Sequence, residues 1–140
     1  MKGTYIIAEM AWSHMGDIKI AKKIAKGAKD AGANAIGIHI TDMPSHMTKN
    51  YKCLAGSTLS DSADQEISIF NYLCKINTSN EDWIEFDKYA NNLNLDIVAM
   101  CNDIVSYNFS KKKKIAAHVL SAGCFGELEL INKIVLENDK

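Results

Sequence analysis

Short apolar runs alternate with longer amphipathic stretches along the chain, and this alternation most constrains the fold. The apolar runs lie at residues 4–10, 35–40, 95–100 and 117–121. Apolar residues at helical spacing fill much of the remainder, at 17–31, 65–75, 78–92, 104–113 and 125–136. Repeated strand–helix units predict an α/β protein with a parallel sheet. The run at 4–10 is almost continuously apolar, which predicts a strand buried on both faces.

The number of units limits the size of the sheet. The chain has 140 residues, which is enough for one domain with its own core. About four strand–helix units fit a half barrel or a small open α/β sheet, since a complete (βα)8 barrel needs about 250 residues. We treat 1–140 as a single domain with a long loop over 41–64, which either serves a function or contains short helices of its own.

Several helix ends have recognisable signals. Asp17 is placed to cap the helix over 17–31, and Gly32 is placed to end it. At the start of the helix over 78–92, Thr78 is the expected cap, with Glu81 reaching back to the backbone.

Charge and cysteine content exclude several classes of function. The formal net charge is -1, so no nucleic-acid partner is expected. The basic run 111–114 is either a solvated face or a phosphate patch. The four cysteines, 53, 74, 101 and 124, lack the close spacing of zinc or redox sites. The sequence shows no secretory signal and no membrane-length apolar run, which predicts a cytoplasmic protein with reduced thiols and no membrane partner.

The first apolar run and its loop contain a recognisable pattern. Residues 8–17 read A-E-M-A-W-S-H-M-G-D, which resembles the opening A-E-I-G-x-N-H-N-G-D of the sialic acid (N-acetylneuraminate) synthase family. Further stretches resemble that family in the same order, at 31–36, 80–83, 97–103, 117–123 and 127–133. The resemblance implies a TIM-barrel-like fold in which this chain matches the N-terminal half of the (βα)8 barrel.

The resemblance also implies a chemistry. Enzymes of that family are transferases that condense phosphoenolpyruvate with an N-acyl amino sugar, such as N-acetylmannosamine, to form nonulosonic acids. A divalent metal, Mn or Mg, activates the sugar aldehyde. The family's metal-binding histidines lie in the half that this chain does not match, so no metal ligand or other cofactor is assigned here.

Two residues match catalytic positions of the family pattern. Glu9 stands at the end of the first strand, where a carboxylate of a barrel is placed for catalysis or sugar contact; the alternative is a glutamate that holds the backbone or a lysine. His14 matches the loop histidine, which could move protons or hold a hydroxyl; the alternative is an exposed loop imidazole. Gly16 is expected to shape the turn into the next helix.

Other polar residues near strand ends are candidates for substrate binding. We assign this role to His39, Ser121 and Asp103. His118 is a further polar group near a strand end, and each lone histidine could instead be structural. Cys101 and Cys124 are interpreted first as small buried hydrophobic residues and second as nucleophiles.

The departures from the family pattern concern the phosphoenolpyruvate site. Where the family has V-K-F-Q-T, this chain has residues 36–40, I-G-I-H-I, so that Gly37 replaces a lysine. K-I-A-S has become residues 119–122, V-L-S-A, and S-T-P has become 99–101, A-M-C. A ligand with a phosphate and a carboxylate needs cations and donors, and these positions no longer supply them.

Three hypotheses follow. The chain is a divergent synthase-like enzyme that makes a nonulosonic acid, with a different ligand or with cations from a partner. Alternatively, it is a catalytically degenerate half barrel that binds or assembles with a second copy or a complementary half, because open sheet edges need cover. The third hypothesis is a fragment of a longer protein. The expected partners are a small sugar or sugar acid and another half barrel.

Overall fold

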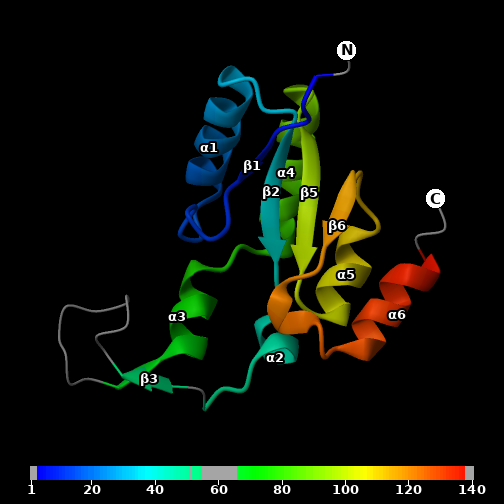
Figure 1. Ribbon diagram of the computed structural model, residues 1–140. Helices are drawn as coiled ribbons and strands as arrows, with labels where there is room; N and C mark the ends of the chain where they lie inside the picture. Colours follow the sequence, from blue (N-terminus) through cyan, green and yellow to red (C-terminus); the bar gives the residue numbers. More distant parts are fainter. Residues whose placement is uncertain (1–2, 51, 55–65, 138–140) are drawn as a thin grey trace.

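Four parallel strands form the sheet on which the molecule is built. The computed structural model describes residues 3–50, 52–54 and 66–137. Its main sheet has the order β1-β2-β5-β6, with all neighbours parallel. The strands are β1 (Ile7–Glu9), β2 (Ala35–Ile40), β5 (Asp96–Cys101) and β6 (Ala117–Val119). The expected α/β fold with about four strand–helix units is confirmed (Figure 1).

Helices cover one side of this sheet. The longest are α1 (Ile18–Asp30), α4 (Asn80–Asn92) and α6 (Leu128–Glu137). The shorter helix α5 (Ile104–Ser110) belongs to the same layer. Helix α4 lies behind the sheet, whereas α1 and α6 lie at its opposite edges (Figure 1). Within the described residues, no helix has the length and apolar character needed to span a membrane.

The connection after β2 contains short elements near the carboxyl ends of the strands. Helix α2 (Met43–His46) follows β2 directly, and α3 (Ile69–Ile76) precedes α4. Between them, β3 (Lys52–Leu54) pairs antiparallel with β4 (Glu66–Ser68). The predicted loop over 41–64 therefore includes α2 and β3, and its residues 51 and 55–64 lie outside the described part of the chain.

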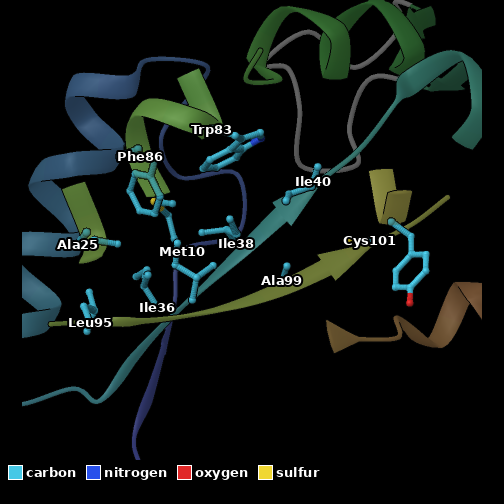
Figure 2. Close-up of a cluster of buried hydrophobic side chains, with 14 of the residues drawn as sticks. Met10, Ala25, Ile36, Ile38, Ile40, Trp83, Phe86, Leu95, Ala99 and Cys101 are labelled. Carbon is cyan, nitrogen blue, oxygen red and sulfur yellow. The ribbon is translucent and has the colours of Figure 1, made fainter. Parts of the chain in front are cut away.

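The hydrophobic core lies between the sheet and the helices (Figure 2). Ile36, Ile38 and Ile40 alternate along β2 and are at most 3% exposed. They pack with Trp83 and Phe86 of α4 in the same buried cluster. Strand periodicity places these isoleucines on one face, so the other face of β2 is free for a different use.

Local signals place most helix ends correctly. The Asp17 side chain accepts the Lys19 N–H at the start of α1, and Gly32 follows α1 with a φ of +89°, as predicted. The expected Thr78 cap of α4 is wrong by one residue. The Ser79 hydroxyl accepts the Asp82 N–H, which leaves Thr78 free to contact the loop after β1.

Strand β1 differs from its prediction. Only residues 7–9 are strand, and Ile7 is 48% exposed. The expected burial on both faces is wrong, because within the described residues β1 pairs only with β2 and lies at the edge of the sheet. An apolar strand at an open edge lacks the neighbour that would bury it.

Candidate ligand site at the strand ends

The face of the sheet opposite the core positions the candidate site. Residues paired in register on parallel strands share a face. Glu9 pairs with Gly37, His39 with Met100, and Met100 with Val119. We call this set the inner face, because it is the side away from the helices. It ends at the carboxyl ends of the strands, where barrel enzymes place their active sites.

Glu9 folds over the neighbouring strand at Gly37. A Cβ added at Gly37 would overlap Glu9 Oε2, so glycine leaves room for the carboxylate in this position, and a larger residue would require the end of the Glu9 side chain to move. Glu9 Oε1 accepts the Ala11 N–H at 2.7 Å, which holds the side chain at the strand end. The side chain is 55% exposed, so it is accessible to a ligand.

His39 stands beside this carboxylate. Its Nε2 lies 3.6 Å from Glu9 Oε1, which is too long for a direct hydrogen bond but close enough for electrostatic interaction. Burial lowers the pKa of His39, and the Glu9 carboxylate partly opposes this by raising it. A pKa below 6.5 leaves the imidazole neutral at pH 7. The pair then offers one acceptor carboxylate and one imidazole able to donate or accept.

The Trp12 ring lies beside His39 of the Glu9–His39 pair. The sequence patterns do not indicate Trp12 as a site residue. Its ring meets His39 edge-on, with centroids 6.2 Å apart, and lies 6.4 Å from the His14 ring. The side chain is half-buried. The only sequence signal is an aromatic residue at the variable position of the loop pattern, between Glu9 and His14.

His14 is buried, although it belongs to the loop between β1 and α1. It is 1% exposed, its Nδ1 accepts the Gly16 N–H at 3.0 Å, and Thr78 Oγ1 lies 3.1 Å away. Its ring packs edge-on against Trp83 at 5.5 Å. Burial, and to a lesser extent His39, lowers the pKa of His14. The alternative of an exposed imidazole is wrong, and a catalytic role stays a prediction.

The loop from β1 to α1 holds an unusual backbone. Ala11 and Met15 adopt φ values of 46° and 52°, a region that glycine and asparagine tolerate best. The family pattern quoted above has Gly and Asn at these two places. Gly16 has a φ of +78°, and a Cβ there would lie 3.1 Å from the Lys75 carbonyl oxygen, so its predicted role in the turn is confirmed.

Asp103 connects two strand ends. Its carboxylate accepts the Ser106 N–H and hydroxyl, both at 2.7 Å, and the Asp42 N–H at 2.9 Å. These bonds cap α5 and link the end of β5 to the start of α2. Asp103 is 6% exposed, so it presents little surface to a ligand in this conformation. Its assignment to substrate binding stays a prediction.

Ser121 follows β6, and its side chain contacts a residue three positions further along the chain. Its hydroxyl donates to Cys124 Sγ at 3.1 Å, within the turn that leads into the 3-10 helix η1 (Ala122–Cys124). Its assignment to substrate binding also stays a prediction.

A pocket opens at the strand ends between α2, the start of α5 and the start of α6. It measures about 330 Å³. Its polar lining includes Ser45, His46, Asn102, Glu127 and Glu129, and no lysine or arginine is among the described residues that line it. A pocket with two exposed glutamates disfavours an anionic ligand.

His118 and Cys101 face the helix side and lie away from the site. His118 Nε2 lies 2.8 Å from Ser110 Oγ, and Cys101 Sγ lies 3.3 Å from the same hydroxyl. Burial raises the pKa of Cys101 to about 11, so this thiol stays protonated at neutral pH. Its interpretation as a buried hydrophobic residue fits this environment, and Cys124 is also buried.

A divalent metal does not fit the residues at hand. Among the described residues, no three or more His, Cys, Asp or Glu side chains gather in a way that could hold one. Glu9 and His39 together offer only two ligands, whereas metal sites in proteins commonly use three or more. We therefore derive no chemical step through a metal on this chain.

Three departures from the family pattern fall on the inner face. Gly37 and Val119 occupy the two lysine positions, and Met100 occupies a threonine position of the patterns quoted above. All three lie on the inner face, with Val119 in register with Met100. The inner face has therefore lost both cations and gained apolar groups, whereas on the core face Ile40 and Ala99 stand where the quoted patterns have threonine and serine.

Sequence comparisons with known proteins find distant relatives of this chain. No family model matches the chain. It is 25% identical over 129 residues to the N-acetylneuraminate-9-phosphate synthase of Drosophila melanogaster, and 25% identical over 134 residues to the uncharacterized protein MJ1065 of Methanocaldococcus jannaschii. These matches include 92% and 94% of this chain but 34% of each relative. The chain thus spans about a third of their length.

Solved structures share the fold. The sialic acid synthetase of Leptospira borgpetersenii superimposes with a TM-score of 0.74 at 18% identity, over 93% of this chain and 40% of that chain. A putative spore coat polysaccharide biosynthesis protein E of Chromobacterium violaceum gives 0.77 at 12% identity, over 99% and 39%. This chain therefore has the fold of half a TIM barrel, and its resemblance to sialic acid synthases is confirmed.

Proposed function

We propose that the chain binds a neutral amino sugar or a closely related sugar at the carboxyl ends of β1 and β2, as a divergent N-acetylneuraminate-synthase-like protein. The observation behind this proposal is the Glu9–His39 pair, 3.6 Å apart at adjacent strand ends. A carboxylate and a neutral imidazole can each bond sugar hydroxyls, and the Trp12 ring beside them offers an apolar surface for the sugar ring.

Phosphoenolpyruvate is a poor match for the same place. Its phosphate and carboxylate need cations, whereas the inner face presents the Glu9 carboxylate over Gly37. Like charges at short range disfavour binding. If this chain takes part in condensing phosphoenolpyruvate with an N-acyl amino sugar to a nonulosonic acid, another polypeptide segment must supply those cations.

Titration calorimetry with N-acetylmannosamine and with phosphoenolpyruvate tests the proposal. N-acetylmannosamine is expected to bind with a Kd of about 1 mM or tighter, and Glu9→Gln to weaken it about tenfold, because a bond to a charged acceptor is lost. Glu81→Gln, on the exposed first turn of α4, is the matched control and should leave the affinity unchanged. Equal affinity of Glu9→Gln and wild type, or no sugar binding, would contradict the proposal.

The calorimetric titration with phosphoenolpyruvate has a separate expected result. We expect no detectable heat with this chain alone. Micromolar affinity would show that cations from elsewhere in the chain reach the inner face, and would favour the synthase reaction over simple sugar binding.

A second candidate function is assembly, as a half barrel that joins a second copy or a complementary half. It is favoured by the exposed apolar residues at the two edges of the sheet, including Ile7 at 48% and Val119 at 37% exposure. Among the described strands these two are edge strands, and the open edge of a sheet is available for pairing with another chain. The mass of the chain in solution, by light scattering, tests this function separately from sugar binding.

A further inference from the structure

Apolar side chains continue the inner face beyond the Glu9–His39 pair. Strand β2 lies between β1 and β5 in the sheet, so His39 has Glu9 on one side and Met100 on the other. Met100 pairs in register with His39, and Val119 pairs with Met100. Met100 is the penultimate residue of β5, and Val119 is the last residue of β6. His39, Met100 and Val119 therefore form one row across the carboxyl ends of three strands.

A further apolar residue lies below this row. Val98 stands two residues before Met100 on β5, so the two side chains share the inner face. Val98 is 4% exposed, yet it is absent from the core cluster that contains its neighbours Ile97 and Ala99. Val98 is thus buried on the inner face. We call Val98, Met100 and Val119 the apolar strip.

The apolar strip and its partners in register offer no cation to a ligand. Two rows of described residues meet here: Glu9, Gly37, Val98 and Ala117 in one, and His39, Met100 and Val119 in the other. None of these described residues is a lysine or an arginine, and Glu9 is the only carboxylate among them. A phosphate or carboxylate placed over the strip would lose its water and gain no partner, whereas an apolar group gains by leaving water.

The apolar strip lies within reach of a small ligand held by the Glu9–His39 pair. Neighbouring strands are about 4.8 Å apart, so Met100 and Val119 stand about 5 and 10 Å from His39 across the sheet. An acyl chain of four carbons, with bonds of about 1.5 Å, extends about 5 Å. Trp12 meets His39 from the loop after β1, on the side away from β5, so a sugar ring beside Trp12 leaves the strip free for a substituent.

We infer that the ligand of the Glu9–His39 pair is a sugar that carries an apolar substituent, and that this substituent lies on Met100 and Val119. The inference rests on the sugar-binding function proposed above and adds the class of sugar. The hydroxyls bond to the carboxylate and the imidazole, while the substituent removes apolar surface of the strip from water. Met100 and Val119 are then the residues that determine specificity.

A rival place for the substituent is the pocket between α2, α5 and α6. Its apolar lining is Ile104, Val105 and Leu130. Neither residue of the Glu9–His39 pair lines this pocket, and no residue of the apolar strip does. The two locations therefore respond to different substitutions, and Val105 is the matched counterpart of Val119.

Titration calorimetry with N-acetylmannosamine and N-butanoylmannosamine tests the inference. The two sugars differ by two methylene groups and carry the same hydroxyls. N-butanoylmannosamine is expected to bind about tenfold tighter, because its additional methylene groups leave water on the strip. Its heat-capacity change on binding should also be the more negative of the two, since burial of apolar surface has this signature.

Variants of the apolar strip locate the substituent. Met100→Gln and Val119→Thr keep the approximate size of each side chain and make it polar. Each should reduce the advantage of N-butanoylmannosamine from about tenfold to about threefold or less, because the methylene groups then cover a polar group. The ratio of the two affinities is the quantity to compare, since a general loss of fold lowers both. Val105→Thr makes the same chemical change in the rival pocket and should leave the ratio at about tenfold.

Three outcomes would overturn the inference. Equal affinities of the two sugars for the wild type would do so and would leave the sugar-binding proposal intact. A ratio that falls in Val105→Thr but not in the two strip variants would assign the substituent to the pocket. A wild type that binds neither sugar would contradict the proposed function, and the inference with it.

Discussion

The two faces of strand β2 differ in what they tolerate. On the outer face, Ile36, Ile38 and Ile40 fill the core beneath α1 and α4. On the inner face, Gly37 and His39 stand at positions where the resembling family pattern has lysine and glutamine. Alternate residues of one strand thus serve packing and recognition separately. The charge of a site on the inner face can therefore change while the fold is kept, because the buried residues of the outer face stabilise it.

The largest expected effect comes from the outer face. Ile38→Ala should lower the free energy of unfolding by about 2–4 kcal/mol, because it removes buried methyl groups and leaves a cavity. His39→Ala, one residue along and half-buried, should change it by less than about 1 kcal/mol. Urea unfolding of both variants measures the contrast. Equal losses would show that the two faces are not divided as described.

A second prediction concerns the fit of Glu9 over Gly37. Gly37→Ala should destabilise the fold by up to about 1 kcal/mol, because the added Cβ displaces only the end of the flexible, exposed Glu9 side chain. In a Glu9→Ala background the same change should cost much less, since the carboxylate is gone. A double-mutant cycle by urea unfolding gives the coupling, and additive losses would argue against contact between these residues.

A third prediction is a fall in stability on acidification. The pKa values of His14, His39 and His118 are all lowered, with burial as the largest cause. A lowered pKa in the folded state means that protonation favours unfolding. Their contribution is complete above the unfolded value of about 6.5 and decreases as the pH falls below it. Denaturation midpoints from pH 8 to 5 measure the slope, which His14→Gln should reduce.

The smallest expected effect lies in the loop from β1 to α1. Ala11→Gly should stabilise the chain by about 0.5–1 kcal/mol, because relief of strain at a positive φ exceeds the entropy cost of glycine. Ala31→Gly, at a helix C-cap with a φ of -79°, is the control and should destabilise slightly. Thermal unfolding distinguishes the two, and a loss of stability with Ala11→Gly would contradict the backbone described for this loop.

Sequence patterns anticipated the sheet better than the site. Strands β2 and β5 lie within a residue of the predicted runs, because continuous apolar stretches between helical ones leave few alternatives. The exposure of Ile7 could not be inferred, since an apolar run does not indicate whether a neighbouring strand is present. The short β3–β4 pair, in a polar stretch without clear alternation, had no period to reveal it.

The site depends on which way each side chain points. Glu9 and His39 were both selected, and register alone brings them together. His118 was selected by the same reasoning but pairs in register with Ala99, a residue of the core face, and so faces α5. A shift of one residue in register reverses the face. The burial of His14 depends on Thr78 and Trp83, 64 or more residues away in sequence, and no local pattern reports it.

The juxtaposition of Glu9 and His39 underlies the proposed site, and an NMR titration of the histidine ring signals tests it most directly. The Glu9 carboxylate raises the pKa of His39, so Glu9→Gln should move the His39 midpoint to lower pH while the midpoint of His118 stays fixed. An unchanged His39 midpoint in Glu9→Gln would show that the two side chains do not meet, and the site described at these strand ends would not exist.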